Sequence, residues 1–260
     1  MLNSRNIWRV VLPSIAVIIF LGSWSLYVRM ADVSAFVLPS PEAIAISLVN
    51  LVQDPSLWYH VRITVTEAAS GFMIAVALGL TLGFVMARVP PVEWAAKPFI
   101  VLLQLVPKIA LAPLFILWFG FGLESKIVIA AALAFFPIFS NALIAFKSVD
   151  KGDSDVMVML QASPLQRLMM LELPTALPVV LTGMEVSVVM AMIGAIVGEF
   201  IGGSEGLGYL AVKYLQELSV PNLFAVIVVL TMVGLTLYLM IGRLRAWFAP
   251  WHGATGAQPH

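Results

Sequence analysis

Long apolar runs separated by short polar segments make up most of this chain. Because about 20 consecutive apolar residues are needed to cross the hydrocarbon core of a bilayer, the pattern predicts six membrane-spanning helices. They lie at about residues 10–27, 63–87, 98–119, 126–146, 176–200 and 223–241. Prolines inside such a span are tolerated where neighbouring helices or water satisfy the carbonyls that they free. The predicted fold class is therefore an all-α polytopic membrane protein.

The distribution of lysine and arginine predicts the orientation of these spans. With the N-terminus in the cytoplasm, nine of these residues fall on the cytoplasmic side, four on the outside and one within a span. Cytoplasmic loops are enriched in positive charge, so both termini are expected inside. The first apolar run is too long for the core of a signal peptide and is expected to remain as a span.

The polar segments divide the chain into three regions. Residues 1–62 hold the first span and an extracytoplasmic amphipathic segment, in which Ser40-Pro41-Glu42 is typical of a helix start. Residues 63–245 form the membrane core, and residues 246–260 are expected to be a disordered tail. Small residues recur every four positions in the second span, which predicts close approach of another helix. They are Gly71, Ala75, Gly79, Gly83 and Ala87.

Residues 150–178 are the least membrane-like part of the second half of the chain. Ser163 is placed to cap a helix that starts at Pro164, with Gln166 as the reciprocal partner of a capping box. Pro174 is expected to end that helix, because proline has no N–H to donate and its ring crowds the preceding turn. The pattern predicts two short helices outside the bilayer. An ordinary loop is the simpler alternative, but the segment holds more Met and Leu than a solvated loop needs, which indicates a partner surface.

Composition limits the chemistry that this chain can carry. It is 61% hydrophobic and 11% charged, its mean hydropathy is +1.02 and its formal net charge is zero, so no nucleic-acid partner is indicated. Without cysteine it has no disulfide or thiolate site. It lacks the P-loop motif G-x-x-x-x-G-K-[ST], which binds nucleotide phosphates, and the zinc-binding motif H-E-x-x-H. Its histidines, at positions 60, 252 and 260, lie far apart in sequence. We expect no metal, no cofactor, no catalytic residue and no enzymatic activity.

Polar and ionisable residues inside the spans are the candidates for a translocation path, because they are costly in hydrocarbon and usually face an interior. Glu185 and Glu199 are fourteen residues apart, which places them about 40° apart around the helix axis with Met192 midway on the same stripe. The alternative for both acids is contact with headgroup water or a backbone N–H. For Lys108, the alternative to a place in the path is that its side chain extends to the membrane interface. For Asn141, the alternative is a hydrogen bond to the backbone near Pro137.

Several short motifs occur in an order that resembles one known family. They are Leu38–Pro41, Pro107–Leu114, Trp118–Gly122, Phe135–Ile138 with Asn141, Leu173–Pro178 with Thr182-Gly183, Gly198–Gly202 and Gly206–Tyr209. Over nearly its whole length the chain resembles the transmembrane permease subunit of a type I bacterial ATP-binding-cassette (ABC) importer, in the nitrate, sulfonate and taurine group. The resemblance implies the type I importer permease fold in the bacterial cytoplasmic (inner) membrane.

In that family the cytoplasmic helix–turn–helix, here at about residues 150–174, is the coupling helix that docks in a groove on the ATPase. Its consensus is of the type E-A-A, three residues, then G. Aligned through Ala162-Ser163, the acid falls on Asp155 and the glycine on Gln161, so a glutamine must form the sharp turn, at a cost if its φ is positive. The resemblance implies ATPase contact around this turn. The residues are Asp155, Val156, Met157, Leu160, Gln161, Ala162, Ser163 and Pro164.

The resemblance also implies partners: an ABC ATPase that hydrolyses ATP, an extracytoplasmic substrate-binding protein, and a second copy of this chain within the membrane lipid. For the solute, residues 193–200 resemble the branch associated with thiamine-pyrimidine precursors and riboflavin, and an acid at Glu185 would disfavour an anion. We expect a small neutral or cationic heterocycle. Sulfonate, taurine or nitrate is the alternative. The alternatives of another class are an ion-coupled secondary transporter using Glu185, Glu199 and Lys108 and a membrane enzyme.

Overall fold

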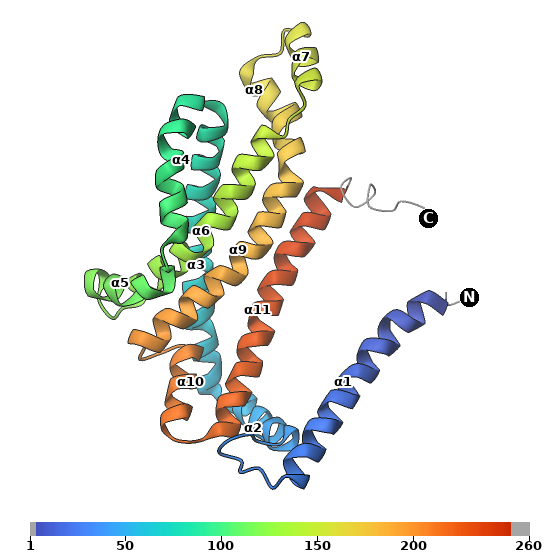
Figure 1. Cartoon of the computed structure of the whole chain (residues 1–260), viewed down its shortest axis with the longest axis vertical. Helices are drawn as coiled ribbons and strands as arrows, with labels where there is room; N and C mark the ends of the chain where they lie inside the picture. The colour runs from blue at the N-terminus through green and yellow to red at the C-terminus, as the bar shows by residue number, and fades with distance from the viewer. Residues whose placement is uncertain (1–3, 251–260) are drawn as a thin grey trace. The chain divides into compact units, whose positions relative to one another are not determined.

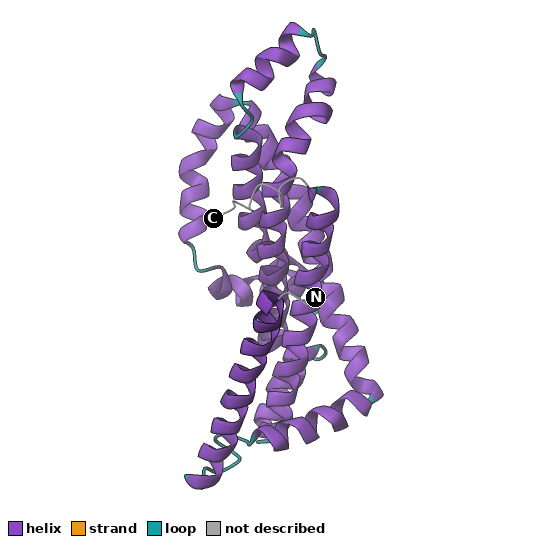
Figure 2. Ribbon diagram, turned by 90° about the vertical axis from the view of Figure 1, so that its right-hand side faces the viewer, coloured by secondary structure: helices purple, strands orange, loops and turns teal. Residues whose placement is uncertain are grey.

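The computed structural model describes residues 4–250, which are almost entirely helical and hold no strand (Figures 1 and 2). The elements, in order, are α1 (Ser4–Met30), α2 (Pro41–Gln53), α3 (Pro55–Arg88), α4 (Pro90–Leu105), the 3₁₀ turn η1 (Lys108–Leu111), α5 (Ala112–Phe119), α6 (Leu123–Lys147), α7 (Lys151–Met159), α8 (Pro164–Arg167), the π turn η2 (Leu168–Glu172), α9 (Leu173–Gly202), α10 (Leu207–Gln216) and α11 (Val220–Phe248).

Five helices in this part of the chain are long and apolar enough to cross a membrane, and a sixth span is formed if the bent pair α4 and η1–α5 counts as one. The two halves of that pair are inclined at 83°. Pro107 lies in the connection between the two halves. Pro113 does not break the span, since it lies in the first turn of α5, where its missing N–H has no helical partner.

Two boundaries differ from the sequence prediction. The loop expected at residues 88–97 is wrong, because α4 starts at Pro90, one residue after α3 ends. Pro90 and Pro91 occupy the first helical positions, where proline is well tolerated. At the other end, α11 continues to Phe248, so the first residues of the expected tail are helical. Residues 251–260 lie outside the described part of the chain.

The chain divides into two compact units. The first comprises residues 1–59 and 210–230, and the second residues 60–209 and 231–260. In the first unit, the predicted helix after Ser40 is confirmed as α2, with the Ser40 hydroxyl accepting the Ala43 N–H at 3.2 Å. Ser25 and Arg29 of α1 both bond Glu42 of α2. The hydrogen bond from Ser25 is the main reason why the pKa of Glu42 falls to about 2.

The core of the second unit is α6, packed between α3 and α9 (Figure 1). A Cβ on Gly71 would lie 2.5 Å from the Ala130 Cβ, and a Cβ on Gly83 2.7 Å from that of Ala142. The small-residue ridge of α3 therefore packs against α6, as its spacing predicts. Gly194 of α9 approaches the Ala130 backbone just as closely. These approaches bring three membrane helices within backbone contact and fix the register of the polar groups that they carry.

Candidate functional site

Helices α7 and α8 form a hairpin whose local structure follows from two caps. Asp150 accepts the Gly152 N–H and starts α7. The predicted capping box at α8 is confirmed: the Ser163 hydroxyl accepts the Gln166 N–H at 3.3 Å, and the Gln166 side-chain oxygen accepts the Ser163 N–H at 2.7 Å. Pro164 occupies the first turn. The two caps set where each short helix begins and leave residues 160–162 to make the turn.

Gln161 adopts the strained conformation that the missing glycine implies. Its φ is +52°, in the left-handed region that residues with a Cβ disfavour. The turn closes with backbone hydrogen bonds from the Gln161 N–H to Val158 and from the Ala162 N–H to Met157. The sharp turn is thus kept without glycine, and the hairpin holds its shape at an expected local cost of about 1–2 kcal/mol.

The expectation that Pro174 ends the second helix is wrong. The chain passes from α8 through the π turn η2 into α9 without a break, and residues 164–202 form one apolar helical run. Pro174 lies in the first turn of α9, and the Leu173 N–H bonds Leu168 five residues back. The wider π turn accommodates the proline. It joins the hairpin directly to the membrane helix.

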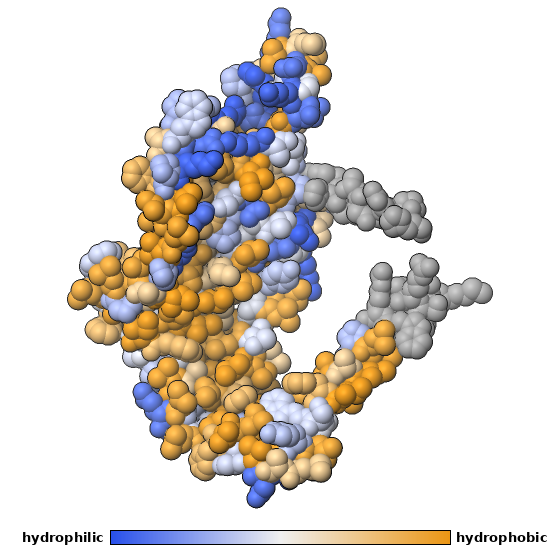
Figure 3. Space-filling model, in the orientation of Figure 1, coloured by the Kyte–Doolittle hydropathy of each residue, from blue (hydrophilic) through white to orange (hydrophobic). Residues whose placement is uncertain are grey.

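The hairpin exposes apolar side chains at its tip. Met159 is 80% exposed and Leu160 70%, while Met157 and Ala162 are half-buried. Asp155, Ser163 and Pro164 are also exposed. Figure 3 shows that hydrophilic residues gather at this end of the second unit. An apolar tip within a hydrophilic end is suited to a helix-in-groove contact with another protein. The exposed residues of the hairpin with large apolar side chains are Val156, Val158, Met159, Leu160 and Leu165.

Glu185 and Met192 of α9 are both buried against other helices. The Glu185 Oε1 lies 3.2 Å from the Arg245 Nε of α11. Arg245 also donates to the Thr182 hydroxyl at 3.4 Å. Met192 lies close to Gly234 of α11. Arg245 balances the charge of Glu185, so Glu185 does not present an uncompensated negative charge.

Glu199 is hydrogen-bonded to the glycine-rich loop that follows α9, here taken as residues 202–208. It accepts the Thr64 hydroxyl at 2.6 Å through Oε1 and the Gly208 N–H at 2.5 Å through Oε2. The Thr64 oxygen in turn accepts the Leu207 N–H at 2.8 Å. Gly206 has a φ of +102°, and a Cβ there would lie 2.0 Å from the Glu199 Oε1. Glu199 is 1% exposed and accepts one backbone N–H, that of Gly208, which is the contact that the alternative interpretation of this acid describes.

Two charged residues beside Glu199 were not identified from the sequence. Glu67 is fully buried and its Oε1 lies 3.5 Å from the Lys126 Nζ. Lys126 is 4% exposed, although the sequence pattern placed it at the outer end of the fourth span and counted it among the extracytoplasmic charges. The signal was present for Glu67, since it is an acid within an apolar span. Thr64, Glu67, Lys126 and Glu199, here called the buried polar cluster, join α3, α6 and α9 to the glycine-rich loop.

Lys108 and Asn141 make local contacts. The Lys108 Nζ donates to the Gln104 carbonyl at 3.2 Å and lies 4.5 Å from the centroid of the Phe136 ring. Asn141 donates to the carbonyl of Pro137 at 2.8 Å, within its own helix. The structure therefore brings Glu199 together with Thr64 and Gly208 and pairs Glu185 with Arg245, whereas the hydrogen bonds of Lys108 and Asn141 go to backbone carbonyls four residues back. Among the described residues no group of three His, Cys, Asp or Glu could hold a metal ion.

These features define a membrane protein in which a short helical hairpin with an exposed apolar tip extends from a set of apolar helices. Residues 75–252 match the family model described as "Binding-protein-dependent transport system inner membrane component". The match covers more than half of the chain, so the protein belongs to this family. It is a permease subunit of an ABC importer in the inner membrane, and ATP hydrolysis is carried out by a separate ATPase.

Curated relatives align over most of their own length. The chain is 33% identical over 240 residues to the formylaminopyrimidine transport permease protein ThiX of Halalkalibacterium halodurans, covering 92% of this chain and 95% of ThiX. It is 33% identical to the riboflavin transport system permease protein RibX of Chloroflexus aurantiacus, covering 92% and 90%. It is 34% identical to the putative aliphatic sulfonates transport permease protein SsuC of Bacillus subtilis, covering 83% and 78%.

The fold has a counterpart among solved structures. A chain of the MetNI methionine ABC transporter, in an inward-facing conformation, superposes with a TM-score of 0.65 at 18% identity. The superposition covers 75% of this chain and 99% of that chain. The shared architecture confirms the expected type I permease fold and an all-helical membrane subunit.

Proposed function

We propose that the α7/α8 hairpin is the surface through which the cytosolic ABC ATPase drives this permease. The observation that carries the proposal is the apolar tip at Met159 and Leu160, exposed at the turn between α7, which is capped by Asp150, and α8, which is capped by Ser163. Exposed Met and Leu on a short rigid helix are what a groove in a partner recognises. The docking surface comprises Asp155, Val156, Met157, Leu160, Gln161, Ala162, Ser163 and Pro164, together with Met159.

The continuous helical connection from α8 through η2 to α9 can transmit movement of the hairpin to the membrane helices. Closure of the ATPases around ATP moves the hairpin, and η2 passes that movement to α9 because no flexible loop separates them. α9 packs against α6 along its length, so the two helices move together. Tight packing transmits such displacements because packed interfaces switch between discrete arrangements. The permease would then alternate between inward- and outward-open states.

Co-purification tests the docking surface. Leu160→Asp is expected to reduce recovery of the ATPase with tagged permease at least tenfold, because a charge cannot enter an apolar groove without desolvation. Leu218→Asp is the matched control, since Leu218 is 65% exposed but lies in the loop between α10 and α11. Met157→Asp is expected to act partly through folding, as Met157 is half-buried. Equal ATPase recovery with Leu160→Asp and wild type would contradict the proposal.

For the solute we propose a small heterocycle of the pyrimidine or riboflavin kind. Support comes from the two relatives named for such compounds, each 33% identical over 240 residues, against 29% over 240 residues for the taurine transport system permease protein TauC of Escherichia coli. The aliphatic sulfonates relative from Bacillus subtilis is 34% identical over the shorter span of 216 residues. The electrostatic argument from Glu185 does not add support, because Arg245 balances its charge. Sulfonate or taurine remains the alternative solute. Lys108, Asn141, Glu185, Met192 and Glu199 stay candidates for the wall of the path.

Reconstituted transport separates these solutes. The permease, its ATPase and the cognate binding protein are placed in proteoliposomes with a labelled pyrimidine, riboflavin or taurine. The proposal expects ATP-dependent uptake of a heterocycle and no uptake of taurine. Uptake of taurine would establish the alternative. Uptake by the permease alone, driven by an ion gradient, would instead indicate a secondary transporter.

A further inference from the structure

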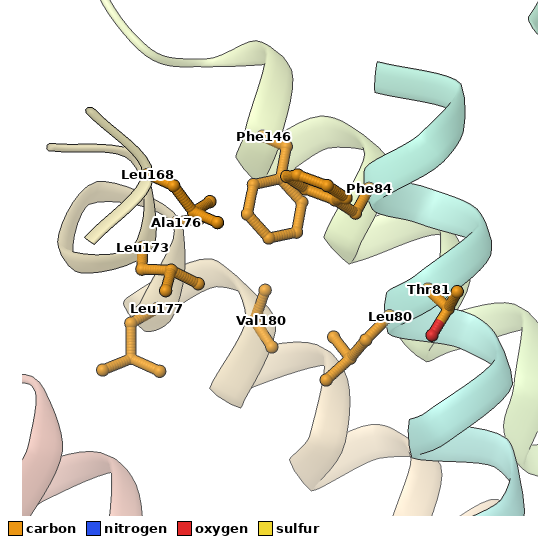
Figure 4. Close-up of a pocket in the computed structure, with 9 residues that line it drawn as sticks. All are labelled: Leu80, Thr81, Phe84, Phe146, Leu168, Leu173, Ala176, Leu177 and Val180. Atoms are coloured by element: carbon orange, nitrogen blue, oxygen red, sulfur yellow. The ribbon is translucent and has the colours of Figure 1, made fainter. Parts of the chain in front are cut away.

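A cavity of about 350 Å³ lies between α3, α6 and the start of α9, beside the base of the coupling hairpin (Figure 4). The phenyl rings of Phe84 and Phe146 meet edge to face on one side, with centroids 5.0 Å apart, and Leu173, Leu177 and Val180 line the other. The hydroxyl of Thr81, which also lines the cavity, is bonded to the Ala77 carbonyl. The wall therefore offers hydrocarbon contacts and suits an apolar chain.

Basic side chains follow the cavity lining at the cytoplasmic ends of these helices. Arg88 lies one turn beyond Phe84, about 6 Å along the helix, and its guanidinium is 5.4 Å from the centroid of that ring. Lys147 directly follows Phe146, and Arg167 directly precedes Leu168 at the cavity wall. A phospholipid has the same arrangement across the membrane. Its charged headgroup lies at the interface, and its acyl carbons lie about one helix turn deeper.

The charges around this mouth leave a positive excess. Arg88 pairs with Glu172 and Lys147 pairs with Glu93. Among the residues that the structure describes, Arg167 makes no ion pair, so these three basic residues, each near a lining residue in sequence, have two carboxylate partners between them. Basic pockets between membrane helices on the cytoplasmic side are suited to anionic headgroups.

We propose that this cavity binds one acyl chain of an anionic phospholipid from the cytoplasmic leaflet, with its phosphate held by Arg167 beside Arg88. The chain packs against Phe84, Phe146 and Leu177. Leu168 and Leu173, at the two sides of the π turn, both line the cavity, so the lipid supports the joint that links the coupling hairpin to α9. The site does not depend on which solute the importer carries.

Lipid retention tests the site directly. Purified permease–ATPase complex is titrated with dioleoyl phosphatidylglycerol or dioleoyl phosphatidylcholine and analysed by native mass spectrometry. Wild type is expected to retain the anionic lipid preferentially. Leu177→Trp fills the cavity and should weaken retention at least tenfold, whereas the matched control Leu239→Trp, at an exposed position of α11, should leave it unchanged. Arg167→Gln should reduce the preference for the anionic lipid at least threefold, and its control Arg243→Gln should not.

Three outcomes would overturn the proposal. Equal retention by Leu177→Trp and Leu239→Trp would show that the lipid binds elsewhere, and equal binding of both lipids by wild type would remove the role of Arg167. The third outcome comes from a separate experiment, in which Leu177 is replaced by the photo-crosslinking residue benzoylphenylalanine. This experiment remains valid if the tryptophan variant does not fold. A photo-crosslink from this position to phosphatidylglycerol supports the site. A crosslink to the ATPase or to a second permease chain would show that protein occupies the cavity.

Discussion

At the scale of single residues, the coupling hairpin carries its strain at Gln161. Side chains with a Cβ lose about 1–2 kcal/mol at positive φ, and Gln161 has a φ of +52° with its side chain exposed. The side chain therefore gains little from burial to offset this cost. The capped helices on either side hold the turn in place despite this cost.

Replacement by glycine should relieve that strain. Gln161→Gly is expected to raise the free energy of unfolding by about 0.5–1 kcal/mol, the strain removed less the entropy that glycine loses on folding. Gln161→Ala keeps the Cβ and should give no gain. Thermal unfolding in detergent measures both variants. Because the two variants differ only in the Cβ, a lower melting temperature for Gln161→Gly than for Gln161→Ala would contradict the strain at this position.

Glycine is required at position 206 for two separable reasons. Gly206→Ala is expected to destabilise the protein by more than about 2 kcal/mol, because it adds a clash with the Glu199 carboxylate to the cost of positive φ. Gly120→Ala is the matched control, since Gly120 has a φ of +82° with no atom within 4 Å of the added Cβ. Thermal unfolding should place the control between wild type and Gly206→Ala. Equal losses would show that Glu199 moves aside freely.

At the scale of elements, the Glu185–Arg245 ion pair ties α9 to α11. Glu185 is 5% exposed, and a buried carboxylate left without its partner is strongly destabilising. Because half of the Arg245 side chain is exposed, solvent screens part of the pair. The pair thus connects the helix that follows the coupling hairpin to the last helix of the second unit.

Removing one partner tests this connection. Arg245→Gln is expected to cost about 1–3 kcal/mol, below the value for a fully buried pair, and the double variant Glu185→Gln/Arg245→Gln should recover part of the loss. Arg29→Gln breaks the exposed pair with Glu42 and should lower the melting temperature less than Arg245→Gln does. A double-mutant cycle from thermal unfolding measures the coupling. An additive cycle would mean that Glu185 is stabilised by other groups.

At the scale of the whole molecule, the chain leaves much apolar helix surface uncovered. None of the apolar window of α1 is buried within the chain, and only about a fifth of that of α11 is. Lipid or another protein must cover these surfaces in the membrane. One chain of six spans at most is also too few to enclose a path, so a second copy is expected.

Native mass spectrometry of the permease–ATPase complex tests this expectation. We predict two permease chains of 28.2 kDa in each particle, together with the ATPase. Dilution should not separate the two copies while nucleotide holds the ATPases together. A particle with a single permease chain that still transports solute would contradict the homodimer.

The sequence by itself determined the class of this protein, because its long apolar runs can be stable only as membrane helices. Caps and small-residue ridges are local signals, so α2, the capping box at Ser163 and the close approach of another helix to α3 were also predictable. The sharp turn at Gln161 was implied by the family resemblance, whose consensus has glycine at that position.

Only the tertiary structure decided which charges meet. The sequence places Lys126 at the outer end of the fourth span, yet it pairs with Glu67 in the interior, and Arg245 of α11 balances Glu185. Such pairs depend on helix register and crossing, which single-helix periodicity does not encode. The continuity of η2 with α9 through Pro174 was decided in the same way, since a π turn shows no pattern in the residues and forms where packing requires it.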